Sequence, residues 1–230
     1  MSQANPFGGE FIISFMTLRK AVGYIGILMP IIVRLGAYVF EGIPSNESIS
    51  AYYYTVMRDV FVGTLCAIGV FLFCYRGLDT QDNMLTNIAG LAAVGIGLFP
   101  MDPTYHHIIS EKFPAIKNPE CYQNHGPLGY HIYMVSTFFI IISYLAIFRF
   151  TKPSQPVITK QKKSRNKIYV VCGIVMLLSL GSIVVLKVSS KDSSIFWPET
   201  IAIIAFGIAW LTKGQAILKD QFPPPGQRSE

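Results

Sequence analysis

Apolar residues along this chain are gathered into six long stretches that are separated by shorter polar segments. The stretches cover residues 21–40, 57–75, 84–101, 128–148, 168–186 and 195–212. An α-helix of about 20 residues is about 30 Å long, which matches the hydrocarbon thickness of a bilayer. The pattern therefore predicts an all-α polytopic membrane protein, a bundle of six transmembrane helices. We expect an N-terminal tail at residues 1–17, the six-helix transmembrane domain at 18–213 and a C-terminal tail at 214–230.

Small residues recur at helical spacing inside several of these stretches. They allow helix backbones to approach closely in lipid, where apolar burial does not drive helices together. We therefore expect a packing role for the small residues and for Pro30, which should also bend the first helix. The set comprises Gly26, Pro30, Gly63, Ala67, Ala89, Ala93 and Gly97.

Charge is scarce and unevenly placed. Charged residues make up 14% of the chain, whereas about a quarter is usual for a soluble domain. Most of the 19 Lys and Arg residues lie in the two terminal segments and in the connections on the same side of the predicted helices. By the positive-inside rule, both termini are predicted to be cytoplasmic. The net charge of +6 follows this loop pattern, so we do not expect a nucleic-acid partner.

Ionisable residues gather near the outer ends of five predicted helices, and we expect no comparable set at the cytoplasmic ends. An ionisable residue inside a span costs about 2.5–3.5 kcal/mol on insertion scales, so it normally faces protein, water or a partner. The sequence therefore predicts a shared polar pocket at the outer interface. Its expected ligand-binding residues are Arg34, Tyr52, Tyr54, Arg58, Asp59, Asp102, His131, Trp197 and Glu199.

Each of these residues also has a simpler interpretation. Arg34 is long enough to reach the headgroups from inside the first helix. Arg58 and Asp59 suit the cap of the second helix, and Glu199 suits the first turn of the sixth, where a carboxylate complements the helix dipole. Trp197 and the tyrosines are typical of an aromatic belt at the membrane surface.

Catalytic and metal-binding roles are a further hypothesis for the same end. His131, Glu199 and Asp59 are the candidates for a general base. The predicted outer loop supplies His106 and His107, which together with His131 are residue types that bind zinc. No zinc spacing motif accompanies them, and no serine–histidine–acid motif is present. There is also no nucleotide or flavin signature, because the glycine-rich "GLAAVGIG" lies inside a helix and follows no strand.

Three stretches resemble an uncharacterised family of bacterial multi-pass membrane proteins that is known only as a domain of unknown function. They are "SISAYYYTVMRDVFVGTLCAIGVFLFCYRG", "NIAGLAAVGIGLFP" and "FWPETIAIIAFGIAWLTKG". This resemblance implies a bacterial inner-membrane location and brings no activity. A looser likeness is to six-span FRAG/DRAM proteins, which also begin a span with a histidine. A weaker one is to the ceramidase and adiponectin-receptor zinc hydrolases, but the last stretch here lacks their His-x3-His pair.

The expected function is binding of a lipid headgroup or a small amphipathic ligand in the outer pocket. One alternative is a membrane-embedded lipid hydrolase or transferase, with or without a metal, and a second is a small transporter. The expected partners are membrane lipids. The sequence leaves open whether the chain forms a homo-oligomer.

Overall fold

The chain is folded into helices throughout the part that can be described. A computed structural model describes residues 8–43, 47–101, 129–153, 159–189 and 193–219, with no strand among them. This confirms the all-α prediction. The described part includes two short helices, the 3₁₀ helix η1 (Ser50–Tyr54) and the π-helical turn η4 (Leu145–Arg149). The long helices are α1 (Gly8–Glu41), α2 (Arg58–Cys74), α3 (Thr80–Leu98), α6 (Gly129–Tyr144), α7 (Lys160–Ser189) and α8 (Phe196–Lys213).

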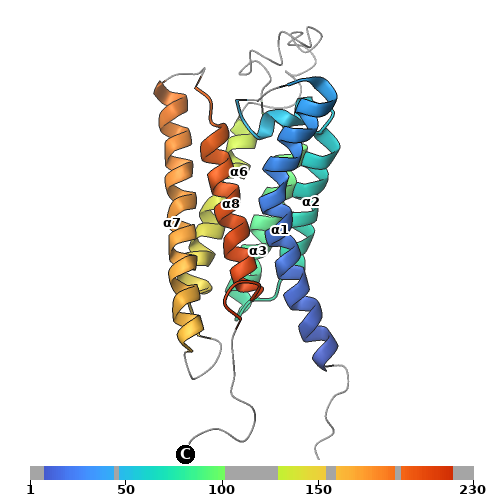
Figure 1. Cartoon of the computed structure of the whole chain (residues 1–230). Helices are drawn as coiled ribbons and strands as arrows, with labels where there is room; N and C mark the ends of the chain where they lie inside the picture. Colours follow the sequence, from blue (N-terminus) through green and yellow to red (C-terminus); the bar gives the residue numbers. More distant parts are fainter. Residues whose placement is uncertain (1–7, 44–46, 102–128, 154–158, 190–192, 220–230) are drawn as a thin grey trace, which may run out of the picture.

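The long helices form a closed ring, in which each one packs against its neighbours along the chain. The packed pairs are α1 with α2, α2 with α3, α3 with α6, α6 with α7 and α7 with α8, and α8 returns to pack against α1. Figure 1 shows these helices side by side and running alternately up and down. Aliphatic and aromatic side chains from all six helices fill the centre of the ring.

The ring has two ends, which we name by a buried residue at each. The Glu199 end, at the top of Figure 1, holds the end of α1, η1 and the beginnings of α2, α6 and α8. The Arg149 end, at the bottom, holds the beginnings of α1, α3 and α7 together with η4 and the end of α8. Gly42, with a φ of 68°, ends α1 in the left-handed conformation that glycine adopts readily.

Two pairs of glycines set the closest helix contacts. A Cβ atom on Gly23 of α1 would lie 2.8 Å from the carbonyl oxygen of Gly207 on α8. A Cβ on Gly69 of α2 would lie 2.8 Å from the carbonyl oxygen of Gly90 on α3. Gly26 belongs to the first of these contacts, as predicted. The packing role expected for Gly63 is wrong, because a Cβ there would meet nothing within 4 Å.

In the described part of the chain, three helices are long and apolar enough to cross a membrane, by length and composition: Phe15–Glu41, Tyr130–Arg149 and Lys160–Ser189. They are consistent with a membrane protein. α1 begins at Gly8, so the helix includes residues 8–17, which we expected to form a separate tail. Large apolar side chains also cover the outside of the ring, such as Val39, Leu91 and Leu178.

Candidate functional site

Glu199 is buried at the start of α8, where the segment before η1 covers it. Its carboxylate oxygen Oε2 accepts a hydrogen bond of 2.7 Å from the Ser48 hydroxyl and one of 2.5 Å from the Ile49 backbone N–H. Ser48 is fully buried, and Glu199 is 8% exposed. A carboxylate in the first turn is also stabilised by the helix dipole. No lysine or arginine among the described residues forms an ion pair with Glu199.

His131 is buried at the start of α6 and connects two other segments. Its Nδ1 atom lies 2.8 Å from the carbonyl oxygen of Phe99, at the end of α3. Its Nε2 atom lies 2.9 Å from the Ser50 hydroxyl oxygen. A carbonyl oxygen can only accept, so Nδ1 carries the hydrogen, and Nε2 of the neutral ring accepts from the serine hydroxyl.

These two buried groups belong to one polar network. The backbone N–H of Ser50 donates to the Ser48 hydroxyl oxygen at 3.1 Å, and Ser48 in turn donates to Glu199. The network therefore joins the start of α6, the short helix η1 and the start of α8. Of the predicted pocket residues, His131 and Glu199 are the pair that this network brings together.

An internal cavity of about 50 Å³ lies beside the network. Ser50 and Glu199 are its polar lining residues. A single water needs about 10–15 Å³ by this measure, so the cavity accepts a few heavy atoms rather than a whole lipid. The apolar lining comes from α1, the segment before η1, α2, α3, α6 and α8: Met29, Ile49, Phe61, Leu65, Ile68, Ile96, Val135, Phe138, Phe139, Ile203 and Phe206.

Arg34 and Trp197 meet at the outer surface of the ring, away from this network. The guanidinium carbon of Arg34 lies 5.1 Å from the ring centre of Phe196 and 5.9 Å from that of Trp197. These are cation–π distances. Trp197 is 62% exposed, so this contact lies at the surface rather than in the buried network.

The tyrosines and the charge pair around η1 are divided between the inside and the surface. Tyr52 is fully buried, and the Tyr54 hydroxyl donates to the Met101 carbonyl oxygen. Arg58 donates a 2.7 Å hydrogen bond to the Tyr53 hydroxyl and is exposed, as is Asp59. Arg58 and Asp59 therefore lie outside the buried network.

The remaining predicted site residues, Asp102, His106 and His107, lie outside the described residues. The proposed metal set depended on two of them together with His131. Within the described ranges, no group of three or more His, Cys, Asp or Glu residues is arranged to hold a metal ion.

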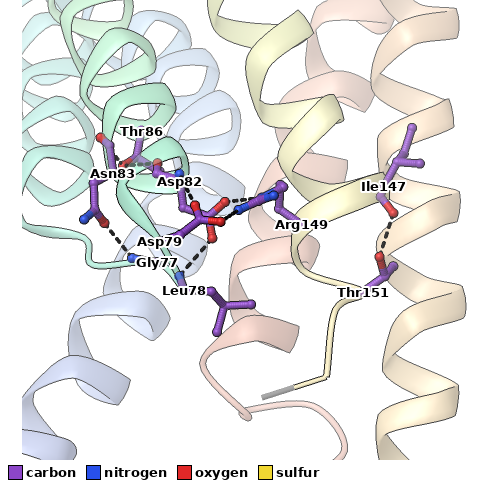
Figure 2. Close-up of polar contacts among 9 residues, drawn as sticks. All are labelled: Gly77, Leu78, Asp79, Asp82, Asn83, Thr86, Ile147, Arg149 and Thr151. Carbon is purple, nitrogen blue, oxygen red and sulfur yellow. Dashed lines mark hydrogen bonds and ion pairs between the residues drawn. The ribbon is translucent and has the colours of Figure 1, made fainter. Parts of the chain in front are cut away.

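At the opposite end, Arg149 forms ion pairs with Asp79 and Asp82 (Figure 2). Asp82, in the first turn of α3, is 3% exposed, and Arg149, in the π-helical turn, is 4% exposed. The sequence-based expectation that this end lacks a comparable ionisable set is therefore wrong. Asp79 caps α3 by accepting the Asp82 backbone N–H at 2.9 Å.

The surroundings of Asp79 favour its charged form. The hydrogen bond from the Asp82 backbone N–H has the largest effect, followed by that from Arg149, and together they lower the pKa of Asp79 below its ordinary value of 3.8. The sequence signal for this site was the Asp-x-x-Asp pattern at a helix start. The sequence does not indicate Arg149 as its partner, because Arg149 lies 67 positions after Asp82 in the chain and only the packing of α3 against η4 brings the two together.

Comparisons of the chain with protein-family models, with curated proteins and with solved structures gave no match. The resemblance to an uncharacterised bacterial membrane family therefore stays a prediction.

Proposed function

We propose that this chain is an integral membrane protein that binds a small amphipathic molecule, or part of a lipid headgroup, at the Glu199 end. All six helices cross the bilayer, both termini are cytoplasmic, and the Glu199 end faces the other side. The observation that carries the proposal is the apolar cavity whose polar lining residues are Ser50 and Glu199.

The lengths of the other three long helices agree with this topology. α2, α3 and α8 contain 17, 19 and 18 residues. At about 1.5 Å per residue they are about 26–29 Å long, close to the hydrocarbon thickness of a bilayer. Fusion of a fluorescent protein or a periplasmic phosphatase to the C-terminus tests the orientation. We expect fluorescence without phosphatase activity, and the reverse result would overturn it.

The ligand is expected to carry a hydrogen-bond donor. Oε2 of Glu199 already accepts from Ser48 and Ile49, so Oε1 is the acceptor for a ligand amine or hydroxyl. Glu199 forms no close ion pair with a described residue, although the charge of Lys187 acts on it, so an amine would be favoured because burial of an unpaired charge is costly. The cavity takes only a short alkyl segment, so the rest of a larger ligand lies between the helices or in the bilayer.

A photoreactive hexylamine that carries a diazirine tests this binding on the full chain in nanodiscs. We expect crosslinks to α2, α6 and α8 residues of the cavity, and competition by hexylamine but not by hexanoate. Glu199→Gln removes the charge and keeps an acceptor, so it should weaken labelling about tenfold. Val135→Phe should fill the cavity and block labelling.

The matched control for the filling variant is Val184→Phe, because Val184 is 50% exposed on α7. The photoreactive hexylamine should label this variant as strongly as it labels the wild-type chain. Crosslinks confined to the outer surface of the ring, or equal labelling of Glu199→Gln and the wild type, would contradict the proposal.

A second candidate function is acyl transfer, which the 2.9 Å contact between Ser50 and His131 favours. In this reaction the Ser50 oxygen attacks an ester carbonyl carbon and its proton passes to Nε2 of His131. The carbon–oxygen bond to the alcohol then breaks, and the alcohol leaves with that proton. Water attacks the acyl-serine, releases the carboxylic acid and restores the serine.

Binding ranks first because the backbone donors beside Ser50 are already used. The N–H groups of Ile49 and Ser50 donate to Glu199 and Ser48, so they do not form a ready oxyanion site. An alkyl fluorophosphonate separates the two functions. A mass adduct on Ser50 that is lost in Ser50→Ala but kept in Ser194→Ala supports acyl transfer, and no adduct on Ser50 excludes it.

A further inference from the structure

Two arginines at the Arg149 end line an open cavity of about 250 Å³, which is separate from the site at the Glu199 end. Arg19 comes from α1, and Arg76 directly follows α2 and its cap residue Tyr75. Phe15 and Met16, one turn before Arg19, complete the lining. The cavity is about five times the size of the one beside Glu199 (250 against 50 Å³) and opens at the end of the ring.

Neither arginine is neutralised by the described residues. The ion pairs at this end use the carboxylates of Asp79 and Asp82, and both go to Arg149. The Nη1 atom of Arg19 lies 3.9 Å from the sulfur of Met16, which is a weak acceptor. Its Nε atom is buried without a hydrogen-bond partner. Such a donor normally finds an acceptor, because leaving it unsatisfied is costly.

The guanidinium group of Arg19 is held in place by an aromatic side chain. Its central carbon lies 5.2 Å from the ring centre of Tyr75, which is itself buried and in edge-to-face contact with Trp210. A guanidinium group fixed in this way loses little freedom when it binds, and its planar set of donors matches the oxygens of a phosphate.

The wider surroundings also favour an anion. Lys20 lies beside Arg19, and a Cβ on Gly214 would lie 2.9 Å from the Lys20 side chain. Lys213, at the end of α8, is repelled by the charge of Arg19 and attracted by that of Asp82. Phe15, which is 41% exposed, places apolar surface next to the arginines.

We propose that the cavity lined by Arg19 and Arg76 is a binding site for a phosphate group. The phosphate is that of an anionic lipid headgroup or a free phosphate, and its oxygens accept from both guanidinium groups. Phe15 and Met16 offer the adjacent apolar surface that a lipid chain would cover.

Binding can be measured on the full purified chain in a neutral detergent, from the rise in melting temperature with added ligand. The probes are dioctanoyl phosphatidic acid, dioctanoyl phosphatidylcholine and inorganic phosphate. Stabilisation by phosphatidic acid alone identifies the lipid headgroup as the source. Stabilisation by inorganic phosphate as well shows that the phosphate group suffices. No stabilisation by either anion would overturn the proposal.

Variants separate a built site from general attraction to a basic surface. Arg76→Gln and Arg19→Gln should each weaken binding by about tenfold or more, because each removes charge-assisted hydrogen bonds. Arg19→Lys keeps the charge, and it should also weaken binding because it loses the planar donor fork. Arg58→Gln, at the far end of the ring, is the control and should bind as the wild-type chain does.

Arg76 is exposed, so Arg76→Gln is expected to fold even where Arg19→Gln does not, and the melting temperature without ligand checks this. Equal binding by Arg76→Gln and the wild type, or an equal loss in Arg58→Gln, would mean that no specific phosphate site exists.

Discussion

The two ends of the ring each bury a carboxylate in the first turn of a helix, but they neutralise it differently. Asp82 of α3 is paired with Arg149. Glu199 of α8 accepts hydrogen bonds from a serine hydroxyl and a backbone N–H. Arg149 pairs with both Asp79 and Asp82 and so joins η4 to the start of α3. A buried carboxylate with neutral donors keeps capacity for a ligand. Under the proposed function, Asp82 is therefore a structural residue, whereas Glu199 is the binding residue.

Removal of Arg149 should produce the largest effect on stability. Arg149→Met leaves Asp82 buried without its cation, and breaking a buried pair in this way costs about 3–5 kcal/mol. Equilibrium unfolding in detergent measures the loss. A second change, Asp82→Asn, should recover part of it, since the uncompensated charge is then gone. A loss below about 1 kcal/mol in Arg149→Met would show that the pair is not structural.

Glu199→Ala should have the next largest effect, because it leaves the Ser48 hydroxyl and the Ile49 N–H without an acceptor. Unsatisfied buried groups of this kind cost about 1–3 kcal/mol. Glu199→Gln keeps an acceptor and should cost less than about 1 kcal/mol. The same unfolding measurement compares the two. If both variants were as unstable as Arg149→Met, Glu199 would be a structural residue like Asp82.

His131→Phe should be milder. It preserves a ring of similar size but removes the acceptor for Ser50 and the donor to Phe99. We expect a loss of about 1–2 kcal/mol, as for unpaired neutral groups. His131→Asn, which can restore one hydrogen bond, is the matched control. Unchanged stability in His131→Phe would show that the network at the Glu199 end does not hold α6 in place.

The smallest expected effect is on the pH dependence of folding stability, to which Asp79 contributes. Its pKa is lowered in the folded chain by the Asp82 N–H and by Arg149. The stabilisation is thus fully present above the unfolded pKa and is lost as the pH falls through the lower folded pKa. The effect is small because the Asp79 side chain is 50% exposed. Asp79→Asn should flatten the acid limb of a melting-temperature profile below about pH 4. An unaltered limb would assign the acid sensitivity to other carboxylates.

Much of the site at the Glu199 end could be foreseen as a set of residue types, but not as a geometry. The sequence placed His131 and Glu199 at the starts of helices on one side. It did not predict Ser48 and Ser50, because isolated serines in a polar connection carry no pattern. Arg58 and Asp59 begin a helix at the same end, yet the rotation of α2 leaves both exposed.

The apolar stretches by themselves indicated that the chain forms helices and approximately where they lie, and the placement of lysine and arginine indicated which ends carry the positive charge. These properties are local or additive along the chain. Only the tertiary structure decided which polar groups meet. The α3–η4 contact joins Asp82 to Arg149, and η1 with Ser48 joins His131 to Glu199. No carboxylate among the described residues pairs with the arginines beside the larger cavity. Such pairings depend on helix rotation and packing, which are set by contacts between residues far apart in the sequence.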